Sequence, residues 1–207
     1  MKKILISSFL VVSALVANKV EVVKTVAVFD ERPANLTVSN EGRMFVSIHP
    51  LINPTTKLIE LTAIGSKNIY PNKEYSFGKD STIAATIAVK ADSKGNLWVL
   101  DLGKKQFVVW DIEKNRLKNT IKIPSNVLTK ASFLQDFVLD EKRNRAIIAD
   151  MTQGDLKSKP EPAFIVVDTK TGLSKRFAQS HKSMMPDFEG GFALNPIAID
   201  PEFNWIY

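Results

Sequence analysis

The stretch GNLWVLDLG, Gly95–Gly103, decides the fold that we predict from this sequence. A polar turn, Asp92–Asn96, leads into an apolar run that contains Trp98 and stops on Asp101-Leu102-Gly103. An apolar run bounded by turn residues indicates a buried strand that is entered through a hairpin turn. Because similar runs recur along the chain, the repeat carries more information than the single strand.

Short β-rich runs dominate the chain from VEVVKTVAVF (Val20–Phe29) to PIAID (Pro196–Asp200), and helical periodicity is almost absent after the N-terminus. Four segments share one pattern of an alternating strand, a polar turn and a more apolar strand: ANLTVSNEGRMFVSIHP, ATIAVKADSKGNLWVLDLG, LQDFVLDEKRNRAIIADMT and NPIAIDPEFNWIY. Their corresponding positions, Val38, Val89, Leu139 and Ile199, are about 50, 50 and 60 residues apart. A second hairpin, QFVVWDIEKNRLKNTIKIP or AFIVVDTKTGLSKRFAQ, follows in the second and third units. About four strands in about 50 residues is the size of a β-propeller blade.

We therefore predict an all-β chain that forms a partial β-propeller of about three blades plus the start of a fourth. A β-sandwich with coincidental internal similarity is the alternative. The fourth unit begins at Asn195, and the sequence stops at Trp205-Ile206-Tyr207, inside the second strand of that unit. A propeller closes a ring of four to eight blades. Three blades and half a hairpin cannot close such a ring, so we expect the chain to be a truncated or split part of a longer ancestral product.

The N-terminal segment MKKILISSFLVVSALVA, residues 1–17, has the layout of a secretory signal peptide. Its apolar run of about 13 residues is shorter than the ~20 residues of a membrane span. We expect cleavage after Ala17, with Ala14 as the alternative site and an uncleaved anchor as the competing interpretation. Residues 18–207 then form the propeller domain of a secreted or periplasmic protein with no stable membrane span after cleavage.

Composition excludes several classes of function. The chain has no cysteine, which rules out disulfides, Cys-ligated zinc and thiol catalysis. The formal net charge is +6, but basic and acidic residues are interspersed without a basic stripe, so we expect no nucleic-acid partner. There is no GxSxG, Walker, HExxH or Gly-rich dinucleotide pattern, and the two histidines, His49 and His181, are expected in loops. We therefore assign no catalytic residue.

Two groups of side chains have structural explanations. Aspartates end four apolar strands, and an aspartate there commonly accepts hydrogen bonds from the backbone of the following turn. These aspartates are Asp101, Asp111, Asp150 and Asp168. We also expect the three tryptophans to pack between blades: Trp98, Trp110 and Trp205.

The order of these strings resembles the yellow and major royal jelly protein family. In that family a Trp-Val-Leu-Asp-x-Gly string precedes a Phe-Asp-Leu strand, and Leu-x-Asp-x-Val-Val-Asp and Ala-Tyr-Ile-Ser-Asp strings follow. The corresponding positions here are 98–103, 109–112, 134–140 and 146–150. The resemblance extends over about Pro33 to Tyr207 and implies a six-bladed propeller, secretion, and usually no catalysis; some members bind small amines or other ligands in the central channel. On this basis the chain is expected to be a non-catalytic small-ligand-binding protein.

Bacterial relatives of this family are often grouped with gluconolactonases, so a metal-dependent lactone hydrolase is the alternative function. Gluconolactonase-type propellers hold a divalent cation through glutamate, asparagine and aspartate oxygens, a donor set that suits calcium or magnesium, and calcium is the cation we expect if one is bound. By resemblance, Glu31 and Asp136 are the candidate metal ligands. The alternative is that Glu31 is a solvated loop residue and Asp136 bonds the blade backbone. No cofactor is otherwise expected, and we expect open blade edges to favour self-association.

Overall fold

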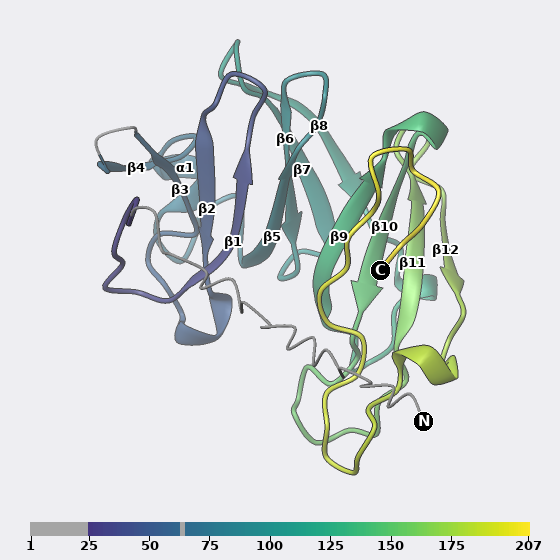
Figure 1. Ribbon diagram of the computed structural model, residues 1–207. Coiled ribbons are helices and arrows are strands. Elements are labelled where there is room, and N and C mark those ends of the chain that lie inside the picture. The colour runs from purple at the N-terminus through teal and green to yellow at the C-terminus, as the bar shows by residue number, and fades with distance from the viewer. Residues whose placement is uncertain (1–24, 63–64) are drawn as a thin grey trace, which may run out of the picture.

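The computed structural model describes residues 25–62 and 65–207. The strands within these residues form three four-stranded antiparallel sheets (Figure 1). Each sheet is a meander in which strands consecutive in the chain are hydrogen-bonded neighbours. The predicted all-β fold and its repeat of four strands are therefore confirmed for the described part of the chain.

The first sheet contains β1 (Pro33–Val38), β2 (Met44–Ile48), β3 (Leu58–Leu61) and β4 (Lys67–Ile69). The second contains β5 (Thr86–Ala91), β6 (Asn96–Asp101), β7 (Gln106–Asp111) and β8 (Arg116–Lys122). The third contains β9 (Leu134–Asp140), β10 (Arg145–Asp150), β11 (Ala163–Asp168) and β12 (Ser174–Phe177). Short helices lie in the connections: η1 (Pro50–Ile52), α1 (Lys73–Ser76), η2 (Ser125–Val127), η3 (Glu141–Arg143) and η4 (Lys182–Met184).

The sheets are arranged as a fan in which the first strand of each sheet is innermost. Strand β1 packs beside β5, and β5 packs beside β9, while the last strand of each sheet lies on the outside (Figure 1). All six residues of β6 are buried, whereas β8 is mostly exposed. In the second sheet the exposed residues are therefore concentrated on the outermost strand.

Aromatic side chains join the second sheet to the third. Phe107 and Phe137 are fully buried, and their ring centroids lie 4.9 Å apart in an edge-to-face arrangement. Trp98 also packs edge-to-face against Phe107, with centroids 5.6 Å apart. Such contacts between large buried rings make the interface between the two sheets part of one continuous core.

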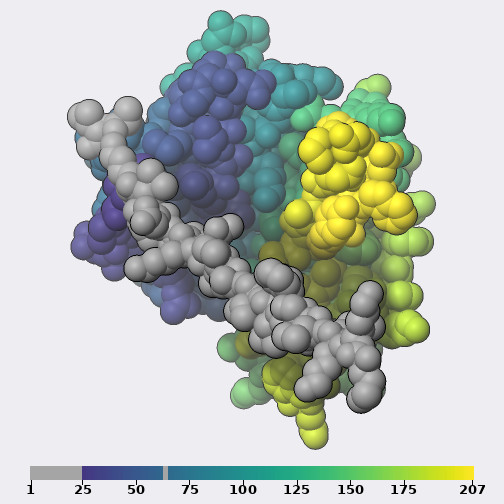
Figure 2. Space-filling view, viewed as in Figure 1, coloured from purple at the N-terminus to yellow at the C-terminus, as the bar shows by residue number. Residues whose placement is uncertain are grey.

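The fourth repeat appears as a short hairpin. Ile199 and Ile206 form an antiparallel bridge, and Ala198 and Tyr207 exchange backbone hydrogen bonds of 3.0 and 2.9 Å. Ile197, Ile199 and Ile206 pack against one face of the third sheet, where Figure 2 shows the C-terminal residues lying over it. The hairpin expected at this end of the sequence is present.

Three details differ from the sequence-based expectation or lie beyond the structure. Residues 25–29, the end of the expected strand Val20–Phe29, form no strand. The first sheet has a fourth strand, β4, that the sequence did not reveal, because its three residues are polar or half-exposed. The predicted signal peptide, residues 1–17, lies outside the described residues. Within the described ranges, no helix is long and apolar enough to cross a membrane.

The carboxylate of Asp101 closes the end of the second sheet. Its side chain is fully buried. It accepts hydrogen bonds from the amides of Gly103 and Lys104 in the following turn, and from those of Ala84 and Ala85 ahead of β5, at 3.0–3.1 Å. The predicted bond between this aspartate and the turn backbone is confirmed, and the same carboxylate also fixes the entry to the innermost strand.

Replacing Asp101 by alanine should strongly destabilise the protein. Asp101→Ala leaves four backbone N–H groups without their acceptor, and we expect the free energy of unfolding to fall by about 3 kcal/mol or more. Asp111→Ala is the matched control, because the Asp111 carboxylate accepts one backbone bond, from Lys114, and its loss should be clearly smaller. Urea unfolding followed by tryptophan fluorescence measures both variants. Equal losses would contradict the role given to Asp101.

Asp140, the last residue of β9, forms a second buried charged group, in the third sheet. Its carboxylate accepts hydrogen bonds from Arg145 Nε at 2.8 Å and from Arg143 Nη1 at 3.0 Å, and Arg143 also donates to the carbonyl of Phe203 in the C-terminal hairpin. Burial acts to raise the pKa of Asp140, but the hydrogen bonds from Arg145 and Arg143 outweigh it and lower the pKa below 3.8.

This lowered pKa predicts a pH-dependent contribution to stability. The contribution is fully present above the ordinary pKa of 3.8 and is lost as the pH falls through the lower folded-state pKa. The difference in unfolding free energy between the wild type and Asp140→Asn should therefore be larger at neutral pH than at about pH 2. Urea titrations at the two pH values measure it. A difference that does not change with pH would refute the assignment.

Candidate functional site

Polar side chains of β1 bind the backbone of β5 along the inner strands. Asn35 Oδ1 accepts from the amide of Val89 at 3.3 Å, and Thr37 Oγ1 accepts from the amide of Ala91 at 2.9 Å. These side-chain bonds take the place of the backbone hydrogen bonds that join two strands of one sheet. They hold the first strands of two sheets side by side and leave polar atoms along the inner wall of the fan.

The inner strands β5 and β9 are linked by an ion pair between Lys90 and Asp136. Lys90 Nζ lies 3.7 Å from Asp136 Oδ1, and the side chain of Asp136 is 10% exposed. Asp136 Oδ1 also accepts from the amide of Phe137 at 2.8 Å, and Oδ2 accepts from the amide of Ile197 at 3.3 Å. Both carboxylate oxygens therefore have partners, as in the backbone-bonding alternative for this residue.

The other candidate metal ligand, Glu31, lies in the exposed segment before β1. Its negative charge acts on Lys57, whose pKa it tends to raise. Calcium takes six to eight oxygen ligands. Within residues 25–62 and 65–207, no group of three or more His, Cys, Asp or Glu side chains could hold a metal ion. Glu31 and Asp136 each lie near a lysine, and their role as metal ligands stays a prediction.

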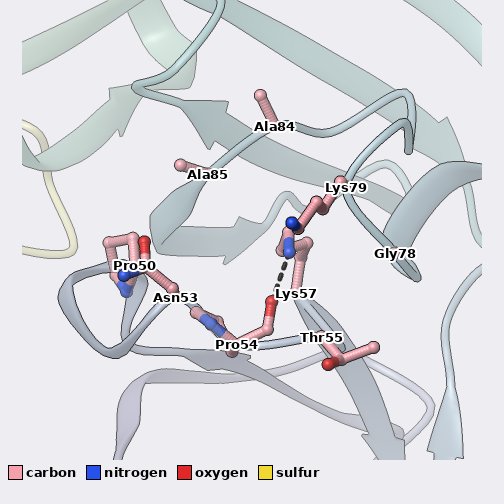
Figure 3. Close-up of a pocket in the computed structure, with 9 residues that line it drawn as sticks. All are labelled: Pro50, Asn53, Pro54, Thr55, Lys57, Gly78, Lys79, Ala84 and Ala85. Carbon is pink, nitrogen blue, oxygen red and sulfur yellow. Dashed lines mark hydrogen bonds between the residues drawn. The ribbon is translucent and has the colours of Figure 1, made fainter.

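A cavity of about 570 Å³ lies where the β2–β3 loop of the first sheet meets the segment that leads into β5 (Figure 3). Figure 3 shows the side chains of Lys57 and Lys79 pointing into this space, with Ala84 and Ala85 across from them. The cavity is lined by Pro50, Asn53, Pro54, Thr55, Lys57, Gly78, Lys79, Ala84 and Ala85. Its charged lining is thus entirely basic.

Backbone hydrogen bonds join the two segments that form one side of this cavity. The amide of Gly78 donates to the carbonyl of Thr55 at 2.8 Å, and the amide of Lys57 donates to the carbonyl of Ser76 at 2.7 Å. The opposite wall, Ala84 and Ala85, is fixed by the buried Asp101 carboxylate. The cavity is therefore bounded by backbone whose position is determined by the fold.

Lys57 is the functional candidate that sequence reasoning missed. The residue is 8% exposed, and its Nζ donates to the carbonyl of Pro54. Burial lowers the pKa of Lys57, and the charge of Glu31 offsets part of that effect. Lys105 occupies the equivalent place, immediately before the third strand of the second sheet, and burial lowers its pKa as well. This equivalence within the repeat is the signal that could have identified Lys57.

The remaining residues singled out in the sequence have structural surroundings. His49 and His181 lie in loops, where each side chain accepts a hydrogen bond at the start of a short 3₁₀ helix. Trp98 and Trp110 are buried in the core as predicted, but Trp205 is 67% exposed. The packing predicted for Trp205 is wrong within the described residues, because its short hairpin presents the ring to solvent.

The sheets and their inner strands define an all-β protein of the propeller-like class. A family model described as major royal jelly protein matches residues 84–193, which is more than half of the 207 residues. The chain belongs to this family. The matched region contains the second and third sheets, including Asp101, Lys90 and Asp136. No curated protein matches the chain in sequence.

Solved structures show the same kind of fold. Two extracellular domains from B. thetaiotaomicron, described as parts of a one-component and a hybrid two-component system, match with TM-scores of 0.52 and 0.53 at 11% and 10% identity. They cover 83% and 88% of this chain, which spans 21% and 22% of theirs. A streptogramin B lyase matches with a TM-score of 0.48 at 15% identity, over 71% of this chain and 40% of its own. At these identities the likeness concerns the fold alone.

Proposed function

We propose that this chain is part of an exported propeller protein that binds a small ligand without catalysing its conversion. The observation that carries the proposal is the Lys90–Asp136 pair on the inner strands. Both oxygens of Asp136 already accept a bond or an ion pair, so the acid forms part of a polar wall. We infer from this bonding that Asp136 serves the wall of a binding site.

The proposal includes a six-bladed ring and export. Family membership supports both, because the major royal jelly protein family implies a six-bladed propeller and secretion, and the family model matches residues 84–193. The short apolar N-terminus with its two lysines, residues 1–17, supports cleavage after Ala17 or Ala14. The mass of the protein recovered from its native envelope tests export, and an intact Met1 in a cytoplasmic fraction would contradict it.

The binding function and the lactone-hydrolase alternative make opposite predictions. We expect no turnover of glucono-1,5-lactone above the uncatalysed rate, with or without calcium. In a thermal-shift panel of small amines and carboxylates, a ligand of the inner wall should raise the melting temperature of the wild type but not of Lys90→Met. Lys118→Met, which removes a lysine from the outer strand β8, is the matched control.

The result that would overturn the proposal is calcium-dependent lactone hydrolysis that is lost in Glu31→Gln. That outcome would make Glu31 a metal ligand and the chain an enzyme. Retention of hydrolysis in Glu31→Gln would still contradict a non-catalytic role. Absence of turnover together with a Lys90-dependent thermal shift supports binding.

Self-association is the second part of the proposal. Leu36 and Val38 on β1 are 55% and 53% exposed, and Val28, in the segment that precedes β1, is 75% exposed. Exposed apolar side chains on an inner strand favour association with another surface. We expect the measured mass to rise with protein concentration in size-exclusion chromatography with light scattering.

Charged substitutions should reverse this association. The double variant Leu36→Lys, Val38→Lys is expected to elute as a monomer at concentrations where the wild type does not. Leu173→Lys is the matched control, because Leu173 is 75% exposed but lies in the turn between β11 and β12. A wild type that stays monomeric at every concentration would refute the prediction.

A further inference from the structure

We propose that the cavity between the first two sheets binds a small organic anion through Lys57 and Lys79. The anionic group would be a carboxylate or a phosphate, and its organic body would lie against the apolar part of the lining. This site shares no lining residue with the Lys90–Asp136 pair, so the inference goes beyond the ligand site of the inner wall.

The positive charge of the cavity lining favours a negatively charged ligand. The charged residues among its lining are Lys57 and Lys79, which come from different connections of the fold and point into the same space (Figure 3). Glu31 acts on Lys57 but is an exposed residue outside the lining. Two ammonium groups facing one cavity repel each other and attract an anion. A cationic ligand is disfavoured by the same charges.

The surroundings of Lys57 make an anion the natural partner of its ammonium group. An ammonium group has three donors, and the carbonyl of Pro54 accepts from the one that Figure 3 marks. Burial of this charge without a full set of partners is unfavourable, which is why the pKa of Lys57 is lowered. An oxyanion in the cavity would accept a charge-assisted hydrogen bond and restore the favourable environment of the charge.

The size and the walls of the cavity define the rest of the ligand. A volume of about 570 Å³ lies within the range of small-molecule sites and exceeds the space needed by an inorganic anion alone. Pro50, Pro54, Ala84 and Ala85 provide apolar surface for a compact organic body. Because Asp101 fixes Ala84 and Ala85, this wall is formed before the ligand binds.

Benzoate and benzamide form a matched pair of probes, because they have nearly the same shape and differ in charge. Isothermal titration calorimetry on the full chain should show one site for benzoate at millimolar concentrations and about tenfold weaker binding of benzamide, as expected for one charge-assisted hydrogen bond. Phenyl phosphate, titrated in parallel, shows whether the site prefers phosphate or carboxylate. Added salt should weaken both anions.

Three lysine variants test the location of the site. Lys79→Gln should weaken benzoate by about tenfold, and Lys57→Gln should weaken it at least as much. Lys94→Gln is the control, because Lys94 is exposed like Lys79 but lines other cavities. If Lys57→Gln does not fold, the exposed Lys79 and the benzoate–benzamide comparison on the wild type still decide the question.

The proposal is overturned if neither benzoate nor phenyl phosphate binds, or if benzamide binds as well as benzoate. It is also overturned if benzoate binding is unchanged in Lys79→Gln or falls equally in Lys94→Gln. None of these results depends on Lys90, so failure here is distinguishable from failure of the proposed inner-wall function.

Discussion

The fold depends on buried carboxylates at the ends of second strands. Asp101 ends β6 and binds the backbone that enters β5, and Asp150 ends β10 and binds the amide of Phe133 ahead of β9 at 2.9 Å. Asp150 also accepts from Arg176 Nη1 at 2.7 Å. An isolated buried charge would be very costly, so these aspartates are compatible with the fold because the backbone and Arg176 surround them with donors. Each one determines where the innermost strand of its sheet begins.

The two candidate binding regions follow from this constraint. Since the inner strands start at defined positions, Lys90 of β5 comes to lie beside Asp136 of β9. The backbone fixed by Asp101 also forms one wall of the cavity that contains Lys57. The carboxylate itself is buried and fully occupied by donors, so its contribution to binding is to position other residues. The candidate contacts with a ligand come from other side chains, Lys57 in the cavity and Lys90 on the inner strands.

Much of the fold could be predicted from the sequence because each repeat consists of short apolar runs separated by polar turns at regular spacing. The apolar run in GNLWVLDLG and its counterparts in the repeat predicted the buried strands, and the position of Asp101 after that run predicted its hydrogen bonds to the turn. The residues of the two candidate binding regions were harder to predict. Lys57 follows a polar Pro-Thr-Thr segment that is typical of an exposed loop, and its burial arises from packing against the distant segment Ser76–Gly78. The pairing of Asp136 with Lys90 likewise depends on contact between two sheets, which no local pattern encodes.

The most direct test of this account is amide hydrogen exchange measured by NMR at the residues that Asp101 binds. Ala84 and Ala85 lie outside the strands, and Gly103 lies in a turn, yet their amides donate to a buried carboxylate. We expect these amides to exchange as slowly as those of the central strand β6, because their hydrogen bonds to Asp101 break only when the second sheet opens. The amide of Asp80, which donates no hydrogen bond within the described residues, provides the reference for a loop. Exchange of Ala84 and Ala85 at the rate of Asp80 would contradict the central role of Asp101.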